Sequence, residues 1–221
     1  MNKQAFFLVS SLLIMVTAVL ALTAASPVTA SGAAQITDSA VYNWWDGGTS
    51  VGTSQLVRNG AGLSASYHVS GLPAGQAMTL WFIIFNNPEN CATSPCSIPA
   101  DVFNPGASAD FYFAGGHVTG GSGNGNFGGH LNVGDMRRSG KAETGMAPAV
   151  PLTNPYGAEV VLVLHSHGPA LTGPALQHQI SSFLGGCQTF TGPDGFAAGE
   201  TDIPDAEGEC SSFQYSLHQG Q

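Results

Sequence analysis

Charged residues are scarce in this chain. Lysine, arginine, aspartate and glutamate make up 9% of its 221 residues, whereas about a quarter is usual. Basic residues are the scarcest, with 5 lysines and arginines against 14 aspartates and glutamates, so the formal net charge is −9. A surface of that sign repels a phosphate backbone, and no basic patch with interleaved aromatic residues offsets it. The composition therefore argues against nucleic-acid binding.

A sustained helical repeat of apolar residues is also absent. Short β-prone runs alternate instead with glycine, proline and asparagine, which is typical of a sandwich or a closed sheet. Residues 78–85 and 158–167 are apolar on both faces, so we expect them at the centre of a packed sheet. Residues 179–183 and 213–218 are expected to complete it. We predict an all-β fold, an antiparallel β-sandwich of the Ig-like kind, in one domain spanning residues 31–221.

Residues 1–30 have the features of a secretory signal peptide. Lys3 gives a positive start, residues 6–22 are apolar apart from three hydroxyl residues, and Val28-Thr29-Ala30 has the small-x-small pattern of a cleavage site. The alternative is a retained N-terminal anchor, although the apolar run is short for a membrane span. We therefore expect a mature chain without a membrane span that is secreted, periplasmic or on the cell surface.

The four cysteines fit an exported chain, because disulfides persist in oxidising compartments. Three pairings are formally open. Pairing of neighbours, Cys91 with Cys96 and Cys187 with Cys210, is the most economical because each bond closes one irregular segment. Neither pair has the CxxC spacing of a zinc or redox site. We expect both bonds to staple the fold, the second one closing an acidic surface stretch at residues 194–209.

Histidine is the main functional lead, with seven residues in a chain poor in other charge. His165 and His167 are separated by one residue on a predicted strand, so their side chains point to one face. His117 and His130 each end a Gly-Gly-His sequence on either side of a glycine-rich reversal. In a hairpin, an odd sum of paired residue numbers places these two on one face and an even sum on opposite faces. The sequence leaves that register open.

These four histidines are candidate ligands for copper or zinc, since paired imidazoles hold transition metals on β scaffolds. The alternative is that they are ordinary solvated or hydrogen-bonded side chains. A shared site requires at least three of the imidazoles to converge, because metal–nitrogen distances are about 2 Å.

Several motifs carry a resemblance to known secreted domains. Gly71-Leu72-Pro73-Ala74-Gly75 leads into an apolar strand, and the runs around Gly116-His117 and residues 159–168 follow. This arrangement resembles CHRD modules. Residues 85–91, 154–159, 166–169 and 179–183 are similar to exported bacterial proteins without an assigned activity. The resemblance covers roughly residues 60–190 and implies an all-β, CHRD-like extracellular domain, with no catalytic residues to carry over.

A second resemblance concerns the histidine motifs. Gly115-Gly116-His117, Gly129-His130, Asn132-Val133-Gly134-Asp135 and His165-Ser166-His167 are similar to pieces of the copper–zinc superoxide dismutases, which are β-sandwiches with histidine ligands. The family's bridging histidine and aspartate ligand have no clear counterpart here, and two cysteine pairs replace its single bridge. The resemblance therefore implies metal binding more than dismutation.

The sequence thus predicts an exported, disulfide-stapled β-domain that acts as a binding or structural module. Residues 86–106 and 194–209 would meet an extracellular ligand or an envelope component. The contrasting hypothesis is a copper or zinc protein of the superoxide dismutase kind. No G-x-S-x-G elbow or other nucleophile–base pair is present, so we expect a non-catalytic role.

Overall fold

The computed structural model describes residues 32–44, 46, 48–191 and 208–221. The chain divides into two units, Met1–Ala30 and Ser31–Gln221, and all described residues belong to the second. The predicted signal peptide and most of the acidic stretch at residues 194–209 lie outside the described residues. Within the described part of the chain, no helix has the length and apolar character needed to cross a membrane.

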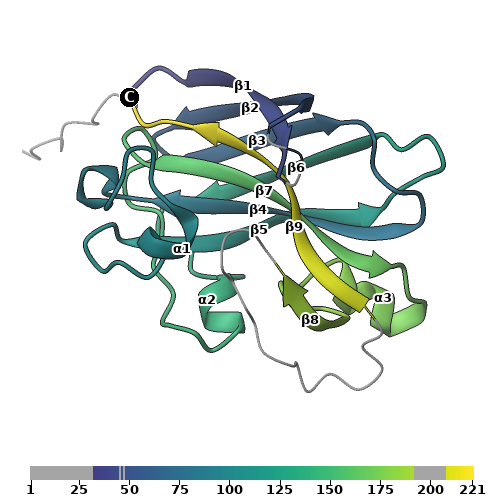
Figure 1. Cartoon of the computed structure of the whole chain (residues 1–221). Helices are drawn as coiled ribbons and strands as arrows, with labels where there is room; N and C mark the ends of the chain where they lie inside the picture. Colours follow the sequence, from purple (N-terminus) through teal and green to yellow (C-terminus); the bar gives the residue numbers. More distant parts are fainter. Residues whose placement is uncertain (1–31, 45, 47, 192–207) are drawn as a thin grey trace, which may run out of the picture. The chain divides into compact units, whose positions relative to one another are not determined.

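Eight antiparallel strands form one sheet, in which neighbours follow the order β5-β4-β7-β9-β1-β2-β3-β6 (Figure 1). Their bounds are β1 Gln35–Asn43, β2 Ser50–Asn59, β3 Gly62–Val69, β4 Gln76–Phe85, β5 Ala109–Val118, β6 Gly125–Asn132, β7 Glu159–Pro169 and β9 Gly208–His218. A short strand, β8 (Cys187–Thr191), runs parallel to β9 outside this path. The predicted all-β class is confirmed.

The two ends of this order, β5 and β6, approach each other closely. A Cβ added at Gly129 would lie 2.6 Å from the Cα of Ala114, and one added at Gly115 would lie 2.7 Å from the carbonyl oxygen of Gly128. Real Cβ atoms essentially never come within 3.0 Å of a heavy atom of a residue that is not their neighbour in the chain. Glycine is therefore required for this approach of two backbones, and the sheet is nearly closed.

Strands β4 and β7 are paired and buried along almost their whole length, as their apolar sequences predict. Alternate side chains enter two separate cores. The inner core takes in side chains from strands at both ends of the strand order and includes Leu63, Leu80, Phe82, Leu131, Leu162 and Leu164. The outer core lies on the opposite face of β4 and β7 and includes Trp81, Ile83, Phe111, Val161, Val163 and Phe183.

Short helices and irregular segments cover the outer core. They are η1 Pro88–Asn90, α1 Ile98–Asp101, α2 Gly140–Glu143 and α3 Gly173–Gln179. Figure 1 shows α2, α3 and β8 below strands β4 and β5, with β1, β2 and β3 above them. The prediction that residues 179–183 finish the sheet is wrong. Gln179 ends α3, and its side-chain amide donates to the carbonyls of His167 and Pro169, at 2.8 and 3.0 Å.

Both predicted disulfides are present. Cys91–Cys96 closes a small ring in the segment between β4 and β5, and Cys187–Cys210 joins β8 to β9. The Cα–Cα distance is 5.3 Å in each, within the usual range for a disulfide. The second bond lies inside the outer core, so it fixes the covering segments onto the sheet.

Candidate functional site

His165 and His167 share the outer face of β7, as their spacing predicts, and both are buried. The His165 ring packs among aromatic side chains, with its centroid 4.7 Å from that of Phe183 and 6.2 Å from that of Trp81. Its Nε2 lies 3.3 Å from Ser212 Oγ. Burial, with the neighbouring His167, holds the pKa of His165 well below its usual value, so this ring is neutral at pH 7.

His167 is held by a chain of hydrogen bonds that begins at Trp81. Trp81 Nε1 donates to Thr79 Oγ1 over 2.8 Å, and Thr79 Oγ1 lies 2.6 Å from His167 Nε2. On the other side of the ring, Nδ1 lies 2.9 Å from the carbonyl oxygen of Gly185. Because a carbonyl only accepts, Nδ1 carries the proton and Nε2 accepts from the Thr79 hydroxyl. Burial lowers the pKa of His167 to about 4, so this single neutral tautomer is present at pH 7.

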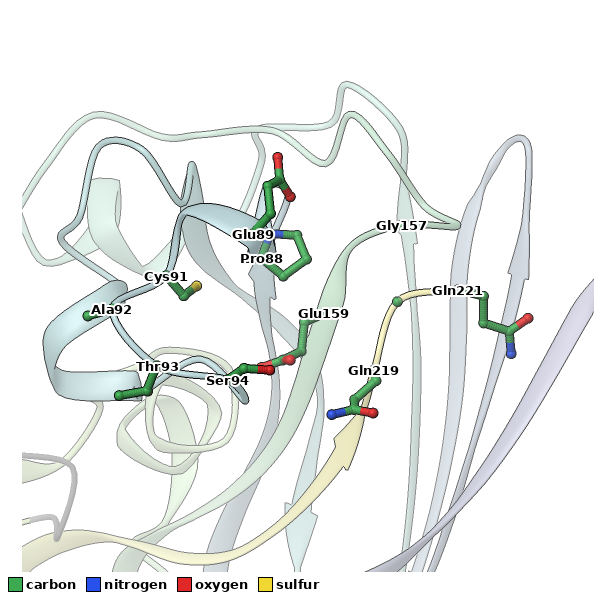
Figure 2. Close-up of a pocket in the computed structure, with 11 residues that line it drawn as sticks. Pro88, Glu89, Cys91, Ala92, Thr93, Ser94, Gly157, Glu159, Gln219 and Gln221 are labelled. Atoms are coloured by element: carbon green, nitrogen blue, oxygen red, sulfur yellow. The ribbon is translucent and has the colours of Figure 1, made fainter.

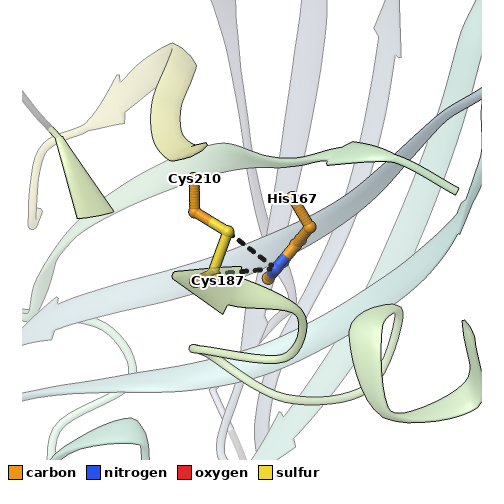
Figure 3. Close-up of side chains that lie close together, drawn as sticks. All are labelled: His167, Cys187 and Cys210. Atoms are coloured by element: carbon orange, nitrogen blue, oxygen red, sulfur yellow. Dashed lines mark hydrogen bonds between the residues drawn. A yellow bond between two sulfur atoms is a disulfide. The ribbon is translucent and has the colours of Figure 1, made fainter. Parts of the chain in front are cut away.

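The same Nδ1 faces the second disulfide (Figure 3). It lies 3.6 Å from Cys187 Sγ and 3.7 Å from Cys210 Sγ. Among the described residues, His167, Cys187 and Cys210 are the one group of three histidine, cysteine or acidic side chains whose ligand atoms lie within 4.8 Å of one another. All three are buried. The cluster combines one imidazole with two sulfur atoms that are bonded to each other in this state.

His117 points to the inner face of the sheet. It lies opposite Met78 of β4, and its ring stacks on Phe127 with the centroids 4.1 Å apart. The reason is a β-bulge at Ala114, which interrupts the pairing of β5 with β4 between Leu80 and Trp81. One extra residue reverses the in–out alternation of the strand beyond it. Burial lowers the pKa of His117.

His130 is exposed on the opposite face of the sheet. It lies opposite Ser64 of β3, with its Nδ1 2.8 Å from Ser64 Oγ and its Nε2 2.9 Å from Asn132 Oδ1. Strands β5 and β6 stand at the two ends of the strand order and are not paired as a hairpin. The Gly-Gly-His echo therefore does not bring His117 and His130 together.

Of the four predicted ligands, the structure thus brings only His165 and His167 side by side, on one face of a single strand. No three of the four form a group of ligand atoms within 4.8 Å in the part of the chain that is described. Their joint role in binding copper or zinc stays a prediction.

A pocket lies where the Cys91–Cys96 ring meets the end of β9 (Figure 2). One wall is formed by Pro88, Glu89 and residues 91–94, and the other by residues 219–221, with Gly157 and Glu159 between them. Gly220 packs so closely on Gly157 that an added Cβ would lie 2.0 Å from the Gly157 carbonyl oxygen. The backbones of residues 157 and 220 are therefore in direct contact at this side of the pocket.

Arg58 ties together two chain segments that adjoin this pocket. Its buried guanidinium donates to the carbonyls of Pro155 and Ala158, before β7, and to those of His218 and Gln219, at the end of β9. The four distances lie between 2.8 and 3.1 Å. One side chain therefore ties together two segments that adjoin the pocket.

The pocket is negatively charged. Glu159 is only 4% exposed, and its Oε1 accepts a hydrogen bond of 2.7 Å from the backbone N–H of Cys96. Burial raises the pKa of Glu159, the Cys96 N–H opposes this, and the nearby Asp101 raises it further. Glu89 lines the same pocket, and no lysine or arginine is among the lining residues. A positively charged group would thus enter a complementary field.

No family model matches this chain, and comparison with curated proteins and with solved structures yields no match either. The CHRD-like and superoxide dismutase-like resemblances therefore stay predictions. Function has to be argued from the chemistry of the sites.

Sequence reasoning missed the contact between His167 and the second disulfide. Cys187 follows His167 by 20 residues, and Thr79, which bonds the other ring nitrogen, precedes it by 88. No local motif signals such an arrangement. The first wall of the pocket falls within residues 86–106, which were predicted as a ligand-contacting loop. Nothing in the sequence indicated that residues 219–221 line the same pocket.

Proposed function

We propose that this chain is an exported, extracytoplasmic binding module whose ligand site is the pocket of Figure 2. The main support is that the pocket combines an irregular loop with two adjoining segments that Arg58 ties together and a nearly buried carboxylate, Glu159. Binding residues commonly lie on loops that a rigid scaffold positions. The two disulfides support an oxidising compartment outside the cytoplasm.

The ligand is a small polar molecule that carries a positively charged group, such as a primary amine. Glu159 is buried beside a further carboxylate, Asp101, and a cation bound next to it would offset the cost of keeping its charge away from water. The hydroxyls of Thr93 and Ser94 and the amides of Gln219 and Gln221 offer hydrogen bonds to the rest of the ligand.

The finer fold description is an Ig-like or CHRD-like β-sandwich. Its layers would be β5-β4-β7-β9 and β1-β2-β3-β6, which are joined by two residue pairs, Tyr42 with Tyr215 and Asn43 with Gln214. The inner core, to which both sets of strands contribute, supports this description.

A histidine-liganded copper or zinc protein, of the superoxide dismutase kind, is the second candidate. It is supported by His165 and His167 on one face of β7. The pocket is favoured over it because His117 and His130 lie on opposite faces of the sheet, away from a common centre.

Isothermal titration with 1,4-diaminobutane tests the proposed pocket, with 1,4-butanediol as the neutral ligand of equal length. The diamine should bind and the diol should not. Glu159→Gln should weaken diamine binding at least about tenfold, which corresponds to about 1.4 kcal/mol.

Glu143→Gln is the matched control for this titration. Glu143 is also a carboxylate that accepts a backbone N–H, from Phe183 at 2.8 Å, but this residue is exposed and is not part of the pocket. Equal losses of affinity in both variants, or equal binding of the diol, would contradict the proposal.

A further inference from the structure

In the cluster of His167, Cys187 and Cys210, the nitrogen–sulfur distances are close to those of a metal site, although the two sulfur atoms are bonded to each other. With metal–sulfur distances of about 2.3 Å and metal–nitrogen distances of about 2.0 Å, adjacent nitrogen and sulfur ligands of a tetrahedral ion lie about 3.6 Å apart. His167 Nδ1 already lies 3.6 and 3.7 Å from the two Sγ atoms. Among these three ligands, only the two sulfur atoms would have to move apart.

A fourth donor lies next to these three. The carbonyl oxygen of Gly185 is 2.9 Å from His167 Nδ1 and 3.8 Å from Cys187 Sγ. Ideal tetrahedral geometry would place it about 3.4 and about 3.6 Å from these atoms. The imidazole, the two sulfurs and the carbonyl oxygen thus lie next to one another in a buried region, and the carbonyl oxygen would have to move about 0.5 Å away from Nδ1 to reach tetrahedral geometry.

We propose that reduction of Cys187–Cys210 converts this cluster into a zinc site, with both thiolates, His167 Nδ1 and the Gly185 carbonyl oxygen as its ligands. The inference is independent of the ligand pocket, which involves the other disulfide. Two thiolates balance the charge of Zn²⁺, which matters in a buried site because an uncompensated charge there is costly. A monovalent ion such as Cu(I) would leave one negative charge in excess.

The hydrogen-bond chain on the other side of the ring suits this role. Metal binding takes the place of the proton on Nδ1, so the neutral imidazole then carries its proton on Nε2. Thr79 Oγ1, 2.6 Å away, accepts from Nε2 with its free lone pair while it still accepts from Trp81 Nε1. A hydrogen bond of this kind commonly orients a metal-binding histidine.

The chemical balance is simple. Two equivalents of a thiol, R–SH, reduce the protein disulfide to two cysteine thiols and become R–S–S–R. Zn²⁺ then displaces one proton from each thiol, and these two protons pass to solvent. The oxidised protein, in which the disulfide is intact, therefore binds no zinc at this position. The zinc site forms only where a thiol reductant reaches the protein.

The experiment compares the oxidised and reduced forms of the same protein. A water-soluble phosphine reduces the disulfides, with one water supplying the oxygen of the phosphine oxide and the two thiol protons. After anaerobic removal of the phosphine, the protein is titrated with Zn²⁺, and with Co²⁺ as an absorbing substitute. The reduced protein should bind one equivalent and show thiolate-to-Co²⁺ charge-transfer absorption, whereas the oxidised protein should show neither.

Matched variants locate the site. His167→Asn should abolish the tightly bound equivalent, whereas His165→Asn, altered two residues earlier on the same face, should retain it. Replacement of Cys187 and Cys210 by serine should abolish binding, and replacement of Cys91 and Cys96 should leave it intact. Binding that survives in His167→Asn, or that depends on Cys91 and Cys96, would overturn the proposal.

Thermal unfolding provides a second test, which applies even if reduction of the disulfide destabilises the fold. Because the metal binds only the folded arrangement of these ligands, Zn²⁺ should raise the thermal unfolding temperature of the reduced protein and leave that of the oxidised protein unchanged. An unchanged unfolding temperature in the reduced protein would equally overturn the proposal.

Discussion

Arg58 shows how much structure can depend on one side chain. It is completely buried, and its two terminal nitrogens donate to four backbone carbonyls from two separate segments. Burial lowers the pKa of Arg58 to about 10, so the guanidinium is still charged at pH 7. In the sequence, Arg58 stands out only as one of few basic residues. Its four partners could not be predicted, because they are backbone atoms brought there by the fold.

Arg58→Lys should lower the free energy of unfolding by about 2–4 kcal/mol, since a single ammonium cannot reproduce a planar fork that serves four carbonyls. Urea denaturation measures this directly. Arg137→Lys is the control, because the Arg137 side chain is 83% exposed in its ion pair with Asp135, and surface pairs contribute about 0–1 kcal/mol. Equal losses in the two variants would show that Arg58 does not have the structural role described.

His218 makes stability depend on pH. Its ring nitrogens lie 2.9 Å from Ser54 Oγ and 2.9 Å from Thr37 Oγ1. Burial and, less strongly, Arg58 lower the pKa of His218 to about 4, whereas Asp38 raises it slightly. The unfolded chain binds a proton at this site below about pH 6.5, and the folded chain does so only near pH 4.

Stability should therefore fall as the pH falls from about 6.5 to 4, with His218 responsible for about 3 kcal/mol at the lower limit. The His218→Asn variant should lose less stability over this interval than the unaltered protein. Urea midpoints at pH 7, 5.5 and 4 provide the measurement. Parallel pH dependence in both proteins would exclude His218 as a contributor.

Among elements, β4 and β7 could be predicted from sequence because both are apolar runs without a turn signal. Strand alternation also predicted correctly that His165 and His167 share a face. The face of His117 could not be predicted, since a single bulge at Ala114 reverses the alternation and nothing in the glycine-rich sequence marks its position. Residues 179–183 have a β-prone sequence, yet the side chain of Gln179 bonds carbonyls at the end of β7.

The contact between β5 and β6 leads to a prediction for Gly129. An added Cβ would lie 2.6 Å from both the Cα and the carbonyl oxygen of Ala114, so Gly129→Ala should destabilise the fold by about 1–3 kcal/mol through overpacking. Gly120→Ala is the matched control, because a Cβ there meets nothing within 4 Å. The check is the thermal unfolding temperature of each variant, and a Gly129→Ala variant as stable as Gly120→Ala would exclude a tight contact at this position.

In the whole molecule, burial removes charges of both signs from the surface, since Asp101, Asp110 and Glu159 are buried as well as two basic residues. Four basic residues follow residue 30, and Arg58 and Lys141 are buried. Lys141 Nζ donates to the carbonyls of Val102 and Ala109, at 2.5 and 2.6 Å. The expectation that the chain does not bind nucleic acid stays a prediction, which rests on the excess of acidic residues in the sequence.

The cysteine pairing was predictable because each bond closes a single irregular segment, whereas the sites were predictable only in part. One wall of the pocket falls in a loop that composition marks, but the other wall is the end of β9, which is distant in sequence. The group around His167 likewise depends on contacts over 20 and 43 residues. Long-range contacts of this kind follow from the strand order, which no local pattern specifies.

A nuclear magnetic resonance titration of the ¹⁵N-labelled protein with 1,4-diaminobutane locates the binding site directly. We expect saturable shifts of the backbone amides of residues 89, 91–94, 157, 159 and 219–221, which line the pocket. We also expect these shifts to be lost in Glu159→Gln. Shifts confined to other parts of the chain, or no saturable shifts at all, would contradict the assignment of this pocket as the binding site.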